Sequence, residues 1–230
     1  MHSLPTGYRA VVLGASGGIG NVFTEILRLD ARCGDLVPLS RSRDGFDITD
    51  EESVAFHARR LAEKPVHLLL CATGVLTFDG HPPEKALKQI DPDVMLAQFR
   101  VNAVGPALGA KHFLPLLARD ERSIAAFLSA RVGSIADNRL GGWVSYRASK
   151  AALNQIVRTA SIELRRTNPD AVAVAIHPGT VETTLSAPYS RGHITIGPEV
   201  AAMNMLQTLD DLSADRSGSF VAYDGRNIVW

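Results

Sequence analysis

The chain has 230 residues, which is enough for one large domain with a well-buried core and too few for two of ordinary size. Lys and Arg number 24 and Asp and Glu number 24, with no basic block, so we expect neither a nucleic-acid nor an anionic-membrane partner. The sequence begins without a signal-peptide pattern and has no apolar run of the roughly 18 residues that a membrane span needs. Cys33 and Cys71 lie in apolar surroundings that suit a reducing compartment, so a cytoplasmic protein is expected.

Short apolar runs alternate with longer amphipathic ones along the chain. Near-continuous Val, Ile, Leu and Ala is typical of strands buried on both faces of a parallel sheet, and it occurs at 9–14, 35–40, 66–72, 123–130, 171–177 and 218–225. Helical periodicity occupies 18–31, 52–63, 93–119 and 145–166. The alternation predicts one α/β domain over 1–230, a doubly wound, Rossmann-like parallel sheet of about seven strands with helices on both faces.

The first expected strand is followed by GASGGIG, residues 14–20. Because Ser16 stands where the usual dinucleotide fingerprint has its second glycine, the spacing is G-x-x-x-G-x-G. With this spacing, as with the usual fingerprint, small residues allow a tight turn that brings the backbone and a helix N-terminus close to a pyrophosphate. A plain tight turn is the alternative. The position after the first strand favours a cofactor-binding turn formed by Gly14, Ser16, Gly18, Ile19 and Gly20.

The second expected strand runs into Ser40-Arg41-Ser42-Arg43, where an NAD-binding site would place a carboxylate on the ribose. A guanidinium there can bind a 2′-phosphate through two hydrogen bonds, so Arg41 favours NADP, with NAD possible. Solvated loop charges are the alternative interpretation of the arginines. Asp47 is a candidate partner for the adenine amino group, against a simple role in a turn.

Four later segments complete the pattern. In CATG, small residues including Ala72 and Gly74 would let backbone approach a cofactor, and Asn102 is an awkward polar residue within a helix. YRASK places Tyr146 and Lys150 on one helical face, and HPGTVET follows the strand 171–177. In this order the motifs resemble the short-chain dehydrogenase/reductase family over essentially the whole chain. GGWVSYRASKAALN and FVAYDG also resemble its small C-factor (C-signal) and sniffer-like carbonyl reductase branch.

The resemblance implies an NADP(H)-dependent oxidoreductase that interconverts a carbonyl and an alcohol on a small organic substrate. It implies that Asn102 organises a proton relay, that Lys150 holds the nicotinamide ribose, and that the chain forms a homodimer or homotetramer. Further cofactor contacts implied by the motif after the strand 171–177 are Pro178, Gly179, Val181 and Thr183.

Tyr146 is the expected acid/base. A phenol with a pKa near 10 is a poor catalyst at neutral pH, but a charge about 4 Å away at an effective dielectric near 20 is worth roughly 4 kcal/mol. Lys150 is therefore expected to lower the pKa of Tyr146 by two to three units before desolvation takes part of this back. A solvated helical pair is the alternative.

The sequence departs from the family at one catalytic position. The residue after the strand 123–130 that should be a serine, with a hydroxyl on the substrate carbonyl, is Ala130. Strand alternation turns the neighbouring Ser129 the other way, so Ser134 is the preferred substitute. If neither serine hydroxyl reaches the substrate carbonyl, the loss of this one donor lowers the rate by about 10²–10³-fold. That loss favours a catalytically weak nucleotide-binding or signalling protein on the same scaffold.

Other residues are given more ordinary roles. His177 is expected to shape backbone rather than catalyse, and Trp143 either lines the substrate cleft or packs a loop. The segment 184–198 is a candidate substrate lid with Tyr189 as a contact, although a mobile loop would look the same. The histidines and cysteines show no metal-binding spacing, so no metal is expected.

Overall fold

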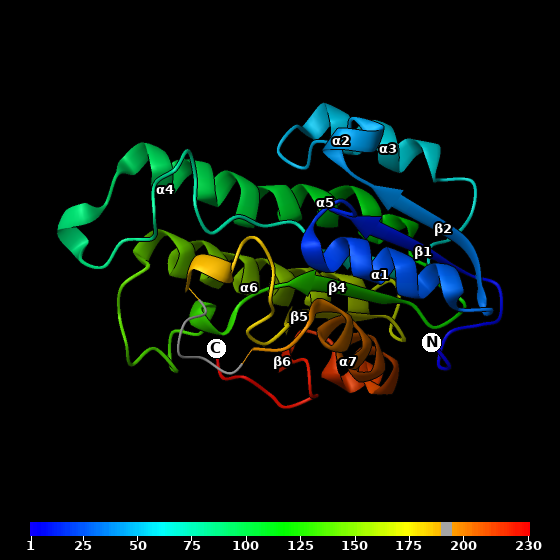
Figure 1. Cartoon of the computed structure of the whole chain (residues 1–230). Helices are drawn as coiled ribbons and strands as arrows, with labels where there is room; N and C mark the ends of the chain where they lie inside the picture. The colour runs from blue at the N-terminus through cyan, green and yellow to red at the C-terminus, as the bar shows by residue number, and fades with distance from the viewer. Residues whose placement is uncertain (190–194) are drawn as a thin grey trace.

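Six parallel strands form one sheet in the computed structural model, which describes residues 1–189 and 195–230. The strand order is β2-β1-β3-β4-β5-β6 (Figure 1). The chain therefore adds β2 on one side of β1, crosses back, and adds β3 to β6 in succession on the other side. The strands are β1 Tyr8–Leu13, β2 Cys33–Leu39, β3 Leu68–Cys71, β4 Ile124–Leu128, β5 Val172–His177 and β6 Phe220–Ala222. The predicted doubly wound α/β architecture is confirmed.

Helices cover both faces of the sheet. On one face α1 packs beside α7, and on the other α3, α5 and α6 enclose a second core. Successive residues of β1 alternate between these cores, as the two-residue period of a strand requires: Ala10 and Val12 join the first, Val11 and Leu13 the second. The helices are α1 Gly18–Leu29, α2 Arg41–Asp44, α3 Glu51–Arg60, α4 Pro92–Phe99, α5 Gly105–Phe113, α6 Val144–Arg165 and α7 Pro198–Asp211.

The expected strand count of about seven is wrong, since the described residues contain six named strands. In the described part of the chain no strand pairs with the outer edge of β2, and the connection from β2 to α3 is a turn held by local hydrogen bonds. The Asp47 carboxylate accepts hydrogen bonds from the Thr49 N–H and hydroxyl, and the Asp47 N–H donates to the Ser53 hydroxyl. Side-chain turns of this kind compete directly with a β ladder.

The helix expected over 93–119 is interrupted. Between α4 and α5 lies a π-helical turn, Arg100–Val104, in which the Gly105 N–H bonds the carbonyl of Arg100, five residues back. Pro106 follows and has no N–H to contribute to the ordinary ladder, which eases the change of register. The turn carries Asn102, which is fully buried. The helix α7 was not anticipated from the sequence at all.

The carboxyl ends of the strands lie together at one edge of the sheet, and the motifs singled out in the sequence follow those ends. No helix in the described ranges, 1–189 and 195–230, is both long and apolar enough to cross a membrane.

Candidate active site

A cleft of 590 Å³ opens beyond the carboxyl ends of β4 and β5. It brings together predicted site residues from three separate motifs: Ile19 from the glycine-rich turn, Tyr146 from α6, and Pro178, Gly179, Val181 and Thr183 from the segment after β5. Ligands of doubly wound sheets bind in such crevices. The structure therefore assembles one site from segments that lie far apart in the sequence.

The glycine-rich turn is built by close backbone contacts. Gly14 has φ +86°, a left-handed conformation that side chains disfavour. A Cβ at Gly20 would lie 2.2 Å from the Gly14 carbonyl oxygen, and one at Gly18 would lie 2.9 Å from Cγ2 of Thr183. The turn and the segment after β5 are thus in contact, and the N-terminus of α1 begins directly above the turn, with Ser16 exposed. This cradle suits a pyrophosphate.

Tyr146 and Lys150 stand one turn apart on α6. Tyr146 is half-buried and lines the cleft, and the Nζ of Lys150 lies 5.9 Å from the centre of the phenol ring. Lys150 is only 3% exposed, and its ammonium donates to the Leu128 carbonyl at the end of β4, at 2.9 Å. The lysine is therefore an internal group held at the edge of the sheet rather than a solvated helical charge.

The protonation of this pair differs from the expectation. Burial raises the pKa of Tyr146 well above its ordinary value, and burial lowers the pKa of Lys150 to about 8. In the chain without a bound cofactor, desolvation of the phenolate thus affects the pKa of Tyr146 more strongly than the nearby ammonium does. At neutral pH Tyr146 carries its proton and Lys150 is still mostly charged.

Asn102 lies beside the same lysine. Its Oδ1 accepts the Val75 N–H at 2.8 Å, and its Nδ2 donates to the Val75 carbonyl at 2.8 Å and to the Ser149 hydroxyl at 3.1 Å. A Cβ at Gly74 would lie 3.2 Å from Lys150 Nζ and 3.4 Å from Asn102 Oδ1. The missing side chain at position 74 therefore leaves room for both polar groups at the end of β3, where Ala72 is also half-buried.

Arg41 is exposed at the start of α2, beyond the end of β2. Among the described residues no hydrogen bond or ion pair holds its guanidinium, and its charge helps to keep the pKa of Asp47 low after the hydrogen bonds from Thr49. The nearest sequence carboxylate, Asp44, turns back to accept from the Ser40 N–H and hydroxyl at 2.8 and 3.1 Å. The exposed charge after β2 is consequently cationic.

The structure does not bring Ser134 to the cleft. Its hydroxyl donates to the Val229 carbonyl at 2.5 Å and accepts from the Asp137 N–H, so it joins the loop before α6 to the C-terminus. Ser129 does line the cleft, but its hydroxyl donates to Asn154 Oδ1 at 2.6 Å. Ala130 lines the cleft as well. Ser134 is therefore absent from the cleft lining, and the hydroxyls of both serines donate to other groups of the chain.

Aromatic rings close the cleft beside Tyr146. Trp143 lines it, with its ring centre 6.2 Å from that of Tyr146 and 5.4 Å from that of Tyr189. Tyr189 belongs to the expected lid segment, 184–198, and Ile196 of that segment forms a β-bridge with Val181, which precedes it. Residues 190–194 of the segment lie outside the described residues. Burial lowers the pKa of His177 to about 4, so the ring is neutral and accepts the Arg131 N–H, which fits a structural role.

One contributor was missed in the sequence. The buried Glu84 accepts the Ser145 hydroxyl and, at 3.3 Å, the Ser145 N–H, while its own carbonyl accepts the Trp143 N–H at 2.5 Å. It thereby caps the N-terminus of α6 just before Tyr146. No local pattern signals this role, because Glu84 lies about 60 residues away in a loop.

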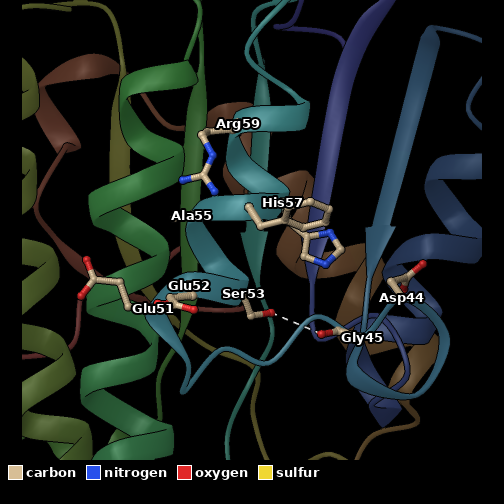
Figure 2. A pocket seen from close by; sticks show the side chains of 9 residues that line it. Asp44, Gly45, Glu51, Glu52, Ser53, Ala55, His57 and Arg59 are labelled. Atoms are coloured by element: carbon tan, nitrogen blue, oxygen red, sulfur yellow. Dashed lines mark hydrogen bonds between the residues drawn. The ribbon is translucent and has the colours of Figure 1, made fainter.

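A second cavity, of 700 Å³, lies over α2 and α3 (Figure 2). The Ser53 hydroxyl donates to the Gly45 carbonyl, and the His57 side chain is among those that line the cavity. It contains no predicted site residue: its lining is Asp44, Gly45, Glu51, Glu52, Ser53, Ala55, Phe56, His57 and Arg59. It is therefore separate from the candidate site.

Two glycines of the turn provide a matched test of the cradle. Gly20→Ala should lower the free energy of unfolding by roughly 2–3 kcal/mol, because its Cβ has no room against the Gly14 carbonyl. Gly17 has φ −75° and its Cβ would meet that oxygen at 3.4 Å, an ordinary contact. Gly17→Ala should therefore melt close to the wild type in a thermal unfolding experiment. Equal melting temperatures for both variants would contradict the close contact.

Comparison with known proteins agrees with this geometry. The sequence model of the short chain dehydrogenase family matches residues 44–193. A relative named 1-hydroxy-2-glutathionyl-2-methyl-3-butene dehydrogenase, from Rhodococcus sp. (strain AD45), is 35% identical over 81% of this chain and 79% of its own. The C-signal protein of Myxococcus xanthus is 36% identical over 63% of this chain and 84% of its own.

Solved structures share the fold. The NADPH-bound carbonyl reductase from chicken fatty liver superimposes with a TM-score of 0.85 at 24% identity, covering 100% of this chain and 97% of that one. The carbonyl reductase Sniffer of D. melanogaster gives a TM-score of 0.83 at 21% identity, covering 98% and 100%. Sequence match and fold together confirm the resemblance, and the chain belongs to the short-chain dehydrogenase family of NAD(P)-dependent oxidoreductases.

Proposed function

We propose that this chain acts as a single-domain, NADP(H)-dependent reductase that interconverts a carbonyl and an alcohol on a small organic substrate. The observation that carries the proposal is the position of Tyr146, which lines the cleft between the glycine-rich turn and the segment after β5, with the buried Lys150 behind it. The names of the relatives, a hydroxy-compound dehydrogenase and carbonyl reductases, support the same chemistry.

The chain's residues fit a nicotinamide dinucleotide. The backbone at Gly14, Gly18 and Gly20, with the exposed Ser16 and the cleft-lining Ile19, would hold the pyrophosphate. Arg41 would bind a 2′-phosphate and Asp47 the adenine. Toward the nicotinamide, the proposed contacts are Ala72, Gly74, Asn102, Tyr146, Lys150, Pro178, Gly179, Val181 and Thr183. When bound, the nicotinamide supplies or accepts the hydride at the carbonyl carbon.

Tyr146 completes the reaction with a proton. In reduction its hydroxyl gives the proton to the carbonyl oxygen, so that the C=O group with one hydride and one proton becomes CH–OH. Because burial keeps the phenol protonated at neutral pH, the residue is ready as an acid in that direction. The ammonium of Lys150 stabilises the phenolate that is left, and Asn102 beside it is the proposed path for returning the proton.

Tyr146→Phe tests the acid. We expect kcat for NADPH-dependent reduction of aldehydes, ketones or quinones to fall by about 10²–10⁴-fold, the usual contribution of a general acid. The readout is loss of NADPH absorbance at saturating substrate, and NADPH affinity measured by fluorescence is the control for folding. Turnover that is unchanged in the variant would remove Tyr146 from the mechanism.

Arg41→Ala tests the cofactor preference. Loss of a charge-assisted contact to the 2′-phosphate should weaken NADPH binding by roughly 10- to 100-fold and leave NADH, which has no such group, close to its original affinity. Arg59→Ala, an exposed arginine on α3 at the second cavity, is the matched control. An equal effect of Arg41→Ala on both cofactors contradicts the assignment.

A second function is favoured by one observation: Ala130 lines the cleft where the family has a serine, and Ser129 donates to Asn154 instead. A scaffold without that hydroxyl suits a nucleotide-binding or signalling protein with weak turnover.

Ala130→Ser separates the two functions. If the chain is a reductase limited by the missing donor, kcat should rise by roughly tenfold or more, a part of the ~10²–10³ that one such donor contributes. The rise should vanish in the double variant with Tyr146→Phe. No turnover by either the wild type or Ala130→Ser, with tight NADPH binding in both, would favour the binding protein.

Two further expectations stay predictions. The segment 184–198 is a candidate substrate lid, supported by Leu185 and Tyr189 in the cleft lining. The chain is expected to assemble as a homodimer or homotetramer.

A further inference from the structure

The lining of the cleft is unevenly charged. Among the residues that the structure describes, the lining contains three arginines, Arg131, Arg139 and Arg147, one carboxylate, Asp137, and no lysine. His177 adds no charge, because burial lowers its pKa to about 4. The arginines come from separate places, the 3-10 turn after β4, the loop before α6, and α6 itself. This concentration was invisible in the sequence, where the three are spread over 17 positions and alternate with apolar residues.

Two of the arginines are already engaged. Arg131 Nε donates to Asp137 Oδ2 at 2.6 Å, which cancels both charges. Arg147 donates through Nε to the Gly142 carbonyl at 2.9 Å and through Nη1 to the Val132 carbonyl at 3.3 Å, so it joins the two loops that frame the cleft. The charge of Arg131 is therefore paired with a carboxylate, and the guanidinium of Arg147 is held by two backbone carbonyls.

Arg139 remains. Within the part of the chain that the structure describes, no hydrogen bond or ion pair engages its side chain, and it is exposed at the cleft mouth. Its five donors are therefore available, in the planar arrangement that pairs with a carboxylate or phosphate through two parallel bonds.

The loop that carries Arg139 is held in place by several hydrogen bonds. Ser134 bonds the Val229 carbonyl, the Ala136 N–H donates to the Trp230 carbonyl at 2.9 Å, and the Gly141 N–H donates to Asn138 Oδ1 at 3.1 Å. The C-terminus and an internal cap thus hold both sides of position 139. Because the backbone on both sides of position 139 is held, the loop loses less conformational entropy when Arg139 binds a ligand.

The lining that Arg139 and Tyr146 share is otherwise rich in apolar and aromatic side chains: Leu76, Val132, Leu140, Trp143, Leu185 and Tyr189. We propose that the substrate of this cleft is a carbonyl compound with an apolar body and an anionic group, which Arg139 binds at the mouth while the carbonyl lies at Tyr146. The proposal rests on the proposed function for the reaction, but the anion site is a matter of binding and can be tested without turnover.

The test compares 4-carboxybenzaldehyde with its neutral methyl ester, methyl 4-formylbenzoate. Both are titrated by calorimetry into the full chain, with and without saturating NADP⁺, in the wild type, Arg139→Ala and Arg119→Ala. Arg119 is an exposed arginine away from the cleft and serves as the matched control. A third ligand, 4-formylphenyl phosphate, distinguishes a phosphate from a carboxylate as the preferred anion.

We expect the wild type to bind the better of the two anions about tenfold more tightly than the ester, as one charge-assisted pair provides, and added salt to reduce the ratio. Arg139→Ala should abolish the preference, whereas Arg119→Ala should keep it. Equal affinity for anion and ester, a preference that survives Arg139→Ala, or no binding of either anion overturns the proposal.

The reaction is assayed separately with NADPH on the same aldehydes. Anion-selective binding without any aldehyde reduction would keep the Arg139 site and overturn the proposed reductase. Reduction of acid and ester with the same kcat/KM in wild type and Arg139→Ala would keep the reductase and remove the anion site.

Discussion

The buried ammonium of Lys150 is the group on which the candidate site depends. Burying a cation is unfavourable unless partners surround it, and Lys150 is only 3% exposed. The partner within 2.9 Å is the Leu128 carbonyl at the end of β4. The ammonium can approach this carbonyl because α6 packs closely against the 3-10 turn that follows β4. At Gly133 of that turn, a Cβ would lie 2.8 Å from the Cβ of Lys150. The sheet, the turn and the helix are thereby fixed together at one point.

The other residues of the candidate site are arranged around the Lys150 ammonium. The space beside the ammonium is left open by Gly74 and shared with Asn102, which the π-helical turn carries into the interior. One turn back on α6, Tyr146 faces the cleft, and Glu84 caps the helix just before it. Burial raises the pKa of the phenol while the lysine stays mostly charged, and this supports the proposed role of the pair in giving a proton and stabilising the anion left behind.

The cleft also differs from the family pattern. Ala130 offers no hydroxyl, and Ser134 serves instead to tie the loop 134–143 to the C-terminus. The same loop presents Arg139, to which the anion selectivity is proposed to belong. The proposed acid, Tyr146, and the proposed anion site, Arg139, are thus different residues of one cleft.

The sequence by itself determined the alternation of buried strands and amphipathic helices, and with it the doubly wound sheet, the glycine-rich turn and the Tyr146–Lys150 spacing. These are local patterns, set by periodicity and by residues that follow each strand directly. Only the tertiary structure decided that β2 is an edge strand, that Ser134 bonds Val229, that Glu84 caps α6, and that the exposed Arg139 lines the cleft. Each of these depends on contacts between segments distant in the chain, which a linear pattern does not contain. The same is true of the balance between desolvation and charge that sets the pKa of the Tyr146 phenol.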